Sequence, residues 1–238
     1  VHYLQEQGVR LESVLDEGGH VTQGPLPGLK GWYALCSVAE KGYAEVRFTA
    51  RSAGGHASTP GRGTPIARLA DFIHEVESSR LFPVRLDAVT RRYLAAAGAN
   101  YPFCRRLWYE NLWLFGPLAA RRLSAKGPGL HALVSTTCAF TLQQGGVAAN
   151  VIPPEASVTA NLRFSTHESM RHALAVMEKI ARRHQLEMTL VTGRDATPAA
   201  DVSSQGYRRL KKAIRQVFPS AGILPDLELG GTDSRHLT

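Results

Sequence analysis

The chain has 238 residues, of which 44% are hydrophobic and 20% charged, with 22 Gly, 13 Pro and a formal net charge of +8. This is the composition of a globular protein, and it excludes disordered, collagen-like and coiled-coil chains. No run of residues approaches the roughly 18 consecutive apolar positions that a membrane span needs.

The first residues and the cysteines indicate how the chain was produced and in which compartment it lies. It starts at Val1 without a signal-peptide pattern, so we expect a piece of a longer protein. The three cysteines are far apart and odd in number, which favours neither a disulfide framework nor a zinc motif. They indicate a reducing, cytoplasmic compartment. They are Cys36, Cys104 and Cys138.

Residues 1–41 predict the edge of a first domain. We expect the end of a helix that stops at Gly8, a short strand over Val9–Leu15 with Asp16 at its end, and a buried strand over Tyr33–Val38. Glu40-Lys41-Gly42 is then expected to turn the chain into the next strand.

Residues 42–194 predict a complete small domain. Alternating apolar residues indicate four strands, and two amphipathic helices lie between them. The order β-α-β-β-α-β is that of the ferredoxin-like sandwich, so the fold class is α/β (α+β). The expected strands are 44–50, 134–142, 157–164 and 188–191.

Two caps and two apolar stripes define the helices of this domain. We expect Thr64 to cap the first helix and Thr166 the second. The expected inward residues of the first are Ile66, Leu69, Ala70, Ile73 and Val76, and those of the second are Met170, Leu174, Met177 and Ala181.

A basic helical insertion occupies about residues 80–127 of this domain, with breaks expected at Pro83, Pro102 and Pro117. Residues 80–126 hold nine Lys and Arg residues against two acidic ones, which is nearly the whole charge excess. The pattern is that of a solvated helical face, and an acidic partner or an anionic membrane surface stays open as an alternative.

Residues 195–238 predict the other edge of the first domain. Pro198 lies in a linker, and the last amphipathic helix presents Tyr207, Leu210, Ile214 and Val217. Neither flank has enough predicted strands for a sheet, which suggests that a small domain is inserted into a larger one.

Six motifs follow one another along the chain. They are Leu15-Asp16-Glu17-Gly18-Gly19, Ala39-Glu40-Lys41-Gly42, Gly54-Gly55-His56-Ala57-Ser58-Thr59-Pro60, Gly145-Gly146 with Asn150-Val151-Ile152-Pro153, Asn161-Leu162-Arg163, and Gly230-Gly231-Thr232-Asp233-Ser234-Arg235. In their order and spacing they resemble the dinuclear zinc aminoacylase/carboxypeptidase family. The carboxypeptidase S-like branch of that family, which includes N-acyl-amino-acid hydrolases, is the most similar. The resemblance implies a catalytic domain with two zinc ions, and a ferredoxin-like lid that also dimerises.

The resemblance assigns roles residue by residue. It makes Asp16 a zinc ligand, where a carboxylate that only caps a turn is the alternative. It makes His56 a lid histidine that reaches the partner subunit's active site and donates to the developing oxyanion, where a surface histidine is the alternative. His236 is interpreted as structural, because the family's last zinc histidine comes later.

Substrate-binding residues follow in the same way. Asn150 and Arg163 match positions that bind the substrate carboxylate, a task that suits a guanidinium fork; a cross-strand ion pair is the alternative for Arg163. The turn of Gly230, Gly231 and Thr232 matches a loop whose backbone approaches the substrate.

Most of the family's zinc ligands have no counterpart here. The sequence has no His-x-Asp string and no adjacent pair of glutamates. We therefore expect a lid domain with two edges of a catalytic domain, inactive alone, and holding zinc weakly or not at all.

Two other classes stay open. The chain can act as a dimerisation module without catalysis, with a homodimer through the lid. Nucleic-acid binding is disfavoured because no predicted strand presents a pair of aromatic residues on its polar face. The basic insertion, with large apolar residues over Leu107–Leu123, is expected to cover its own sheet or line an acyl channel more than to bind a membrane surface.

Overall fold

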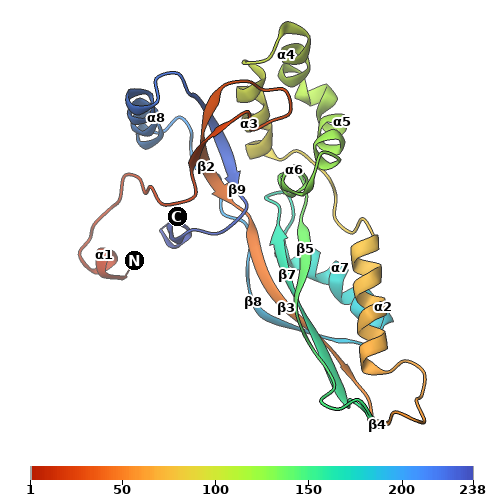
Figure 1. Ribbon diagram of the computed structural model, residues 1–238. Coiled ribbons are helices and arrows are strands. Elements are labelled where there is room, and N and C mark those ends of the chain that lie inside the picture. The colour runs from red at the N-terminus through yellow and green to blue at the C-terminus, as the bar shows by residue number, and fades with distance from the viewer. Residues whose placement is uncertain (1, 238) are drawn as a thin grey trace. The chain divides into compact units, whose positions relative to one another are not determined.

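The computed structural model describes residues 2–237 and divides them into two compact units (Figure 1). The first unit contains the described residues up to Lys41, Val84–Val134, and the described residues from Ala196. The second contains Gly42–Pro83 and Ser135–Asp195. The basic insertion, which the sequence analysis assigned to the 42–194 domain, is thus grouped with the flanking segments.

The second unit is a four-stranded antiparallel sheet with two helices. The strands lie in the order β5-β7-β3-β8. In chain order the elements are β3 (Gly42–Arg51), α2 (Pro65–Ser78), β5 (Thr137–Gln144), β7 (Glu155–Phe164), α7 (Met170–Arg183) and β8 (Glu187–Arg194). This is the expected ferredoxin-like arrangement, and the prediction is confirmed.

Alternation along β3 and β7 produces the core of this unit. Ala44, Val46 and Phe48 are fully buried on one side of β3, and the register places Val46 opposite Ala160. Their apolar side chains form a cluster with residues of α2 and α7. The intervening residues lie on the opposite, polar face of the sheet.

Helix α2 begins at Pro65 as predicted, but it is rotated relative to the expected stripe. The side chain of Thr64 makes no capping hydrogen bond. Ile66 is 44% exposed, whereas Phe72 is fully buried and lies 4.6 Å from the Phe48 ring, centroid to centroid. The large ring of Phe72 turns its side of the helix inward, and Ala70 is left exposed.

Helix α7 begins three residues later than predicted. Its cap is Ser169, whose Oγ accepts a hydrogen bond from the N–H of His172 at 3.2 Å. The expected cap at Thr166 is therefore wrong, because Ser169 is the residue in extended conformation next to the first turn. Met177 and Ala181 are buried as expected.

The first unit contains a three-stranded sheet in the order β1-β2-β9. Strand β2 (Trp32–Glu40) confirms the expected strand at Tyr33–Val38, and it pairs antiparallel with β1 (His20–Gln23) and parallel with β9 (Gly222–Glu228). Neither β1 nor β9 was predicted. The predicted strand at Val9–Leu15 is wrong, since that segment has no regular structure after α1 (His2–Glu6).

The basic insertion forms three helices, α3 (Ala88–Gly98), α4 (Phe103–Glu110) and α5 (Leu112–Ser124), and the short helix α6 (Pro128–Ala132) follows it. Pro83 and Pro102 lie outside helices as predicted, whereas Pro117 lies inside α5. Pro117 is accommodated although it lacks the N–H that would continue the helix. Helix α3 packs against β9, α4 packs against α3, and α5 against α4.

The remaining elements are short or lie near the ends of the chain. Loop 52–63 contains β4 (Gly55–His56), which pairs with β6 (Val151–Ile152). The C-terminal part holds α8 (Gln205–Val217), as expected, and the 3-10 turn η1 (Asp233–His236). Within residues 2–237, no helix combines the length and apolar character that a membrane crossing requires.

Lys41 and its neighbours do not form the predicted turn. β2 ends at Glu40 and β3 begins at Gly42 in a different sheet, so the strands are not joined as a hairpin. Lys41 is only 1% exposed, and its Nζ donates a hydrogen bond of 2.9 Å to the carbonyl of Ala132 at the end of α6. A buried cation thus satisfies a carbonyl at a helix C-terminus.

We predict that Lys41→Met destabilises the chain by about 1–3 kcal/mol, because the Ala132 carbonyl loses a buried donor. Urea unfolding followed by circular dichroism measures this change. The control is Lys212→Met on the exposed surface of α8, which should change stability by less than about 0.5 kcal/mol. Equal midpoints for the two variants would contradict a stabilising role for Lys41.

Candidate functional site

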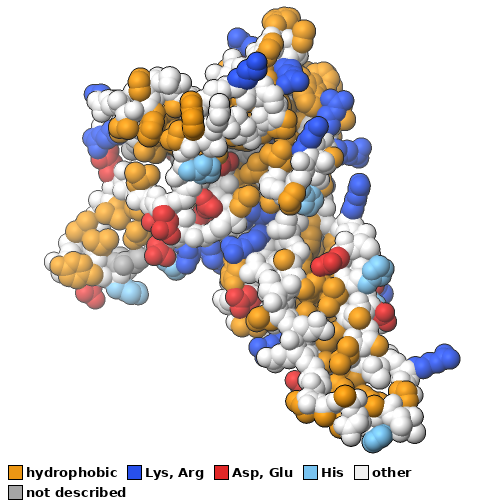
Figure 2. Space-filling model, viewed as in Figure 1, with side chains coloured by type: hydrophobic (Ala, Val, Ile, Leu, Met, Phe, Trp, Pro, Cys, Tyr) orange, Lys and Arg blue, Asp and Glu red, His pale blue; other side chains and the backbone are white. Residues whose placement is uncertain are grey.

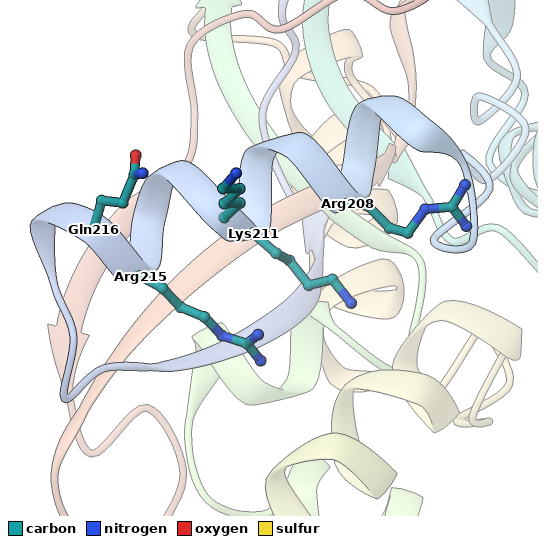
Figure 3. A pocket seen from close by; sticks show the side chains of 5 residues that line it. Arg208, Lys211, Arg215 and Gln216 are labelled. Atoms are coloured by element: carbon teal, nitrogen blue, oxygen red, sulfur yellow. The ribbon is translucent and has the colours of Figure 1, made fainter.

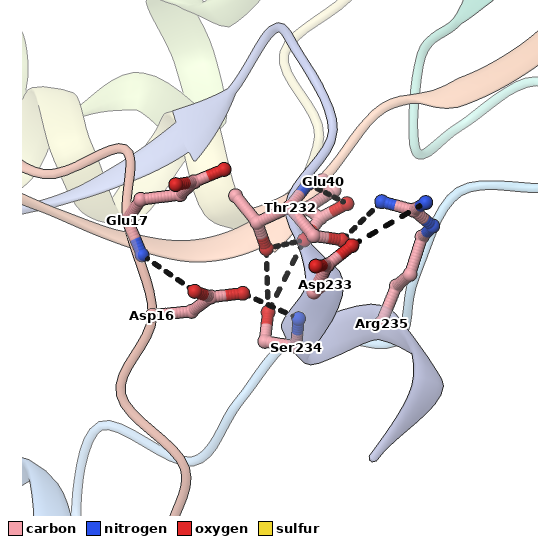
Figure 4. A network of polar contacts seen from close by, with 7 residues as sticks. All are labelled: Asp16, Glu17, Glu40, Thr232, Asp233, Ser234 and Arg235. Carbon is pink, nitrogen blue, oxygen red and sulfur yellow. Dashed lines mark hydrogen bonds and ion pairs between the residues drawn. The ribbon is translucent and has the colours of Figure 1, made fainter.

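The first candidate site lies in the first unit, at the edge where β2 and β9 end. The two strands are parallel, and the register places Glu40 opposite Glu228. Parallel strands bring their carboxyl ends to one edge of a sheet, where loops commonly form sites. Figure 4 shows that the loop containing Asp16 and the loop that follows β9 meet at this edge.

Asp16 is held by backbone donors from both loops. Its Oδ1 accepts from the N–H of Glu17 at 2.9 Å and its Oδ2 from the N–H of Ser234 at 2.6 Å (Figure 4). These hydrogen bonds, first that of Glu17 and then that of Ser234, lower the pKa of Asp16. Because Asp16 is otherwise exposed, its carboxylate stays ionised and accessible to a cation.

Glu40 organises the second loop, and the sequence analysis did not single out its side chain. The residue is 5% exposed, and its carboxylate accepts from the N–H of Thr232 at 3.2 Å, from the Thr232 hydroxyl, and from the Ser234 hydroxyl at 3.2 Å. Thr232 is itself buried. Glu40 therefore fixes the loop whose Ser234 N–H holds Asp16.

Glycine is required where the Asp16 loop passes Glu228. Gly18 has a φ of +110°, and a Cβ there would lie 2.6 Å from Oε2 of Glu228. Glu228 in turn accepts from the N–H of Gly230 at 2.9 Å and from the Ser37 hydroxyl at 3.3 Å. The glycine allows the first loop to approach the carboxylate that shapes the second.

The described residues do not form a metal site by themselves. No group of three or more His, Cys, Asp or Glu side chains lies close enough together in residues 2–237 to hold an ion. Asp16 has accessible oxygens, whereas the Glu40 carboxylate is buried against Thr232 and Ser234. One carboxylate cannot hold two zinc ions, and His236 is exposed on η1 without a metal-binding cluster around it.

The second candidate site lies in the second unit, around His56. Nδ1 of His56 accepts from the backbone N–H of Ser58 at 3.2 Å, and it lies 2.7 Å from the Ser58 hydroxyl. With Nδ1 engaged as acceptor, the neutral ring carries its proton on Nε2. The exposed imidazole therefore has an N–H donor available on the side away from its loop.

Asn150 lies beside His56. Its carbonyl accepts from the N–H of Ala57 at 2.9 Å, next to the pairing of His56 with Val151. Its side chain is exposed, and its amide has no hydrogen-bond partner within residues 2–237. The structure thus brings together two of the residues that the sequence analysis selected.

Arg163 lies on the polar face of β7 and is held at one side of its guanidinium. Its Nε donates to Oδ1 of Asn161 at 3.1 Å, and its Cζ lies 4.6 Å from the centroid of the Tyr43 ring. Its two terminal nitrogens have no partner in the described part of the chain. Arg194 also lies over Tyr43, at 5.8 Å, because β3 pairs Tyr43 with both arginines.

Arg163 is far from His56 and Asn150 within the second unit. In the β3–β7 register Tyr43 is opposite Arg163, whereas Arg51 at the far end is opposite Glu155. β6 leads directly into that far end. The eight-residue separation along β7 corresponds to roughly 26 Å at the rise of a strand, so the expected grouping of Asn150 with Arg163 does not occur within one chain.

A cationic groove lies along α8 (Figure 3). It is open, and the lining side chains are those of Arg208, Lys211, Lys212, Arg215 and Gln216. Figure 3 shows Arg208, Lys211 and Arg215 projecting from the same side of the helix. The groove has no acidic lining residue, so it does not offer the acid–base chemistry of a catalytic site.

The sequence matches the M20 peptidase dimerisation domain over residues 38–189. Two relatives are the N-fatty-acyl-amino acid synthase/hydrolase PM20D1 of Xenopus tropicalis, 31% identical, and that of Homo sapiens, 30% identical; each match covers 99% of this chain but 46% and 47% of the relative. A probable carboxypeptidase S-like 2 of Dictyostelium discoideum is 31% identical over 94% of this chain and 43% of its own length.

Solved structures agree with the fold. The M20 family metallo-carboxypeptidase Sso-CP2 from Sulfolobus solfataricus aligns with a TM-score of 0.55 at 13% identity, covering 82% of this chain and 54% of that one. The Saccharomyces cerevisiae di-peptidase Dug1p aligns at 0.51 with 11% identity, covering 80% and 43%.

This chain therefore contains a peptidase dimerisation domain with a ferredoxin-like fold. It belongs to the M20 peptidase family, and it spans about half the length of the curated relatives it matches. The predicted resemblance to the zinc aminoacylase/carboxypeptidase family is confirmed at this level.

Asp226 supplies a pH-dependent prediction. It lies on β9, where burial raises its pKa to about 6. The folded state therefore binds a proton on the Asp226 carboxyl more tightly than the unfolded chain does. As the pH rises from about 4 through 6 this carboxyl ionises in its buried position, and the folded state loses stability. We expect Asp226→Asn to become more stable than wild type over this range, by up to about 3 kcal/mol at pH 7.

Thermal unfolding at pH 4, 5, 6 and 7 measures this difference, with Asp71→Asn on the exposed surface of α2 as control. A constant gap between Asp226→Asn and wild type across the range would contradict a raised pKa at Asp226.

Proposed function

We propose that this chain is the dimerisation part, and a portion of the substrate site, of a zinc-dependent hydrolase that cleaves the amide bond of an N-acyl amino acid or a dipeptide. Relatives whose names describe N-fatty-acyl-amino acid hydrolysis and carboxypeptidase action support the reaction class. The observation that carries the substrate class is Arg163, whose guanidinium is fixed by Asn161 and Tyr43 with its terminal nitrogens unpartnered.

Arg163 binds the substrate carboxylate in this proposal. A guanidinium with its Nε already engaged presents the two terminal nitrogens as a fork, which matches the two oxygens of a carboxylate. The Tyr43 ring holds the plane of the fork through a cation–π contact. Ligands without a free carboxylate are therefore disfavoured.

His56 acts on the scissile carbonyl of a substrate held by the partner protomer, and Asn150 beside it binds the substrate's carboxylate end together with Arg163 of the partner subunit. The separation of roughly 26 Å along β7 prevents one chain from placing Arg163 and His56 on the same small molecule. A homodimer removes this conflict, because Arg163 of one protomer and His56 of its partner can meet one substrate. Nε2–H of His56 then donates to the carbonyl oxygen as negative charge develops.

Asp16 would contribute one carboxylate to the zinc ions, and Gly230, Gly231 and Thr232 form a loop whose backbone approaches the substrate. The hydrogen bonds that lower the pKa of Asp16 support the ligand role, since a ligand must be ionised. The described residues cannot hold a zinc pair by themselves, so this chain's own residues bind and orient, and we expect it to be inactive alone. A cytoplasmic location is proposed on its three free cysteines.

We expect N-acetylalanine to shift the Nε–H resonance of Arg163 in a saturable NMR titration, whereas N-acetylalanine amide leaves it unchanged. Arg163→Lys should weaken binding by about fivefold or more, because a single ammonium cannot pair with both oxygens. The matched control is Arg47→Lys. Arg47 is exposed on β3, on the same face of the sheet as Arg163, and its substitution should change affinity by less than about twofold. Equal binding of acid and amide would refute the carboxylate assignment.

A further inference from the structure

A patch of exposed apolar side chains covers α4 and α5 in the first unit. We call it the α4–α5 patch. Its members are all large, and each is exposed by 45% or more: Phe103 (77%), Leu107 (51%), Trp113 (76%), Leu114 (57%) and Leu118 (45%). Exposed apolar residues that occur singly are ordinary, but several large ones gathered on two successive helices mark an interaction surface.

The sequence of α5 explains why the patch stays exposed. The opposite side of the helix is already buried, with Leu112, Ala119, Ala120 and Leu123 in the core of the unit. The exposed side repeats apolar residues at Trp113, Leu114, Pro117 and Leu118. Residues 112–118 of α5 are thus apolar on both the buried and the exposed side of the helix, and the exposed side requires an apolar environment besides the core of the unit.

Helices α4 and α5 lie outside the layer that covers the sheet. α3 is the helix that packs against β9, and α4 and α5 follow it as successive neighbours. Of the two roles that the sequence favoured for this segment, covering its own sheet is met by α3, whereas lining an acyl channel stays a prediction. The α4–α5 patch needs a different partner.

Cations border the patch. Arg105, Arg106, Arg121, Arg122 and Lys126 are exposed on or next to α4 and α5, whereas the acidic residue among 103–126, Glu110, is paired with Arg106 at 2.7 Å. Figure 2 shows hydrophobic side chains over these helices with Lys and Arg side chains around them. Cζ of Arg122 on α5 lies 5.1 Å from the centroid of the Trp108 ring on α4.

We infer that the α4–α5 patch is a peripheral anchor for a lipid bilayer that contains acidic phospholipids. Trp, Phe and Leu side chains enter the boundary between headgroups and acyl chains, while Arg and Lys contact the phosphates. α5 has 13 residues and is too short to span a bilayer, so it lies in the interface. Nucleic acid would match the cations and leave the apolar side chains in water.

Flotation of the chain with vesicles tests the anchor. We expect binding to phosphatidylcholine vesicles with about 30% phosphatidylglycerol and loss of binding at about 1 M NaCl. Trp113→Ser should weaken partitioning about tenfold, because an inserted indole is lost. The matched control is Trp32→Ser, a comparably exposed tryptophan on β2, which should leave partitioning unchanged. Circular dichroism verifies that both variants fold.

Two double variants test which cations contribute to vesicle binding. Arg121→Gln with Lys126→Gln should weaken binding about tenfold or more, at about 1 kcal/mol per cation near the surface. Lys212→Gln with Arg215→Gln, in the α8 groove, should have little effect. The inference is overturned if the α8 double variant, rather than the α5 one, loses vesicle binding, or if the chain binds neutral vesicles as strongly as acidic ones. It is also overturned if Trp113→Ser and Trp32→Ser change partitioning equally. Dissociation of an oligomer or loss of RNA binding by Trp113→Ser would instead assign the patch to a protein or RNA partner.

Discussion

The hydrogen-bonded register between β3 and β7 is the constraint on which the second unit depends. All ten residues of β3 have a partner in β7, without a bulge. The same register places Phe48 and Val158 in the core, Tyr43 beside Arg163, and Arg51 beside Glu155 at the end that leads to His56. A shift by one residue would turn Arg163 into the core and the apolar residues to the polar face. The positions of the candidate residues thus follow from burial of the apolar face.

In the first unit, two buried charged residues hold the segments around the candidate site in place. Glu40 and Lys41 are adjacent in sequence and almost fully buried, and they bind different segments. Glu40 accepts hydrogen bonds from the loop after β9, and Lys41 donates to the end of α6. Buried charges are tolerated when they are hydrogen-bonded, and removal of a partner is costly. The end of β2 therefore fixes the loop that holds Asp16.

Much of the second unit was predictable because its strands are half-buried. Alternation in Ala44–Ala50 and Ser157–Phe164 reports directly which face is covered, and the element order then gave the ferredoxin-like fold. Strands β1 and β9 were missed for a physical reason. β1 has only four residues, and β9 contains Pro225 and Asp226, so neither carries a clear alternation.

Some features of the candidate sites were predictable from local sequence motifs, whereas others depend on contacts between distant segments. Asp16, His56 and Arg163 stand in recognisable motifs, and the structure gives each of them accessible polar atoms. The role of Glu40 depends on a contact with Thr232, 192 residues away in the sequence, so no local pattern could reveal it. The distance between Asn150 and Arg163 likewise depends on strand register. Exposure of the α4–α5 patch was also invisible to sequence, because α3 rather than α4 or α5 covers β9.

The measurement that tests this account most directly is the mass of the chain in solution together with its zinc content. Gel filtration with light scattering gives the mass, and elemental analysis of the same fraction gives the zinc. The account predicts a dimer without tightly held zinc, because the described residues contain a dimerisation domain but no metal-binding cluster. A monomer with two zinc ions per chain, active on an N-acyl amino acid, would contradict it.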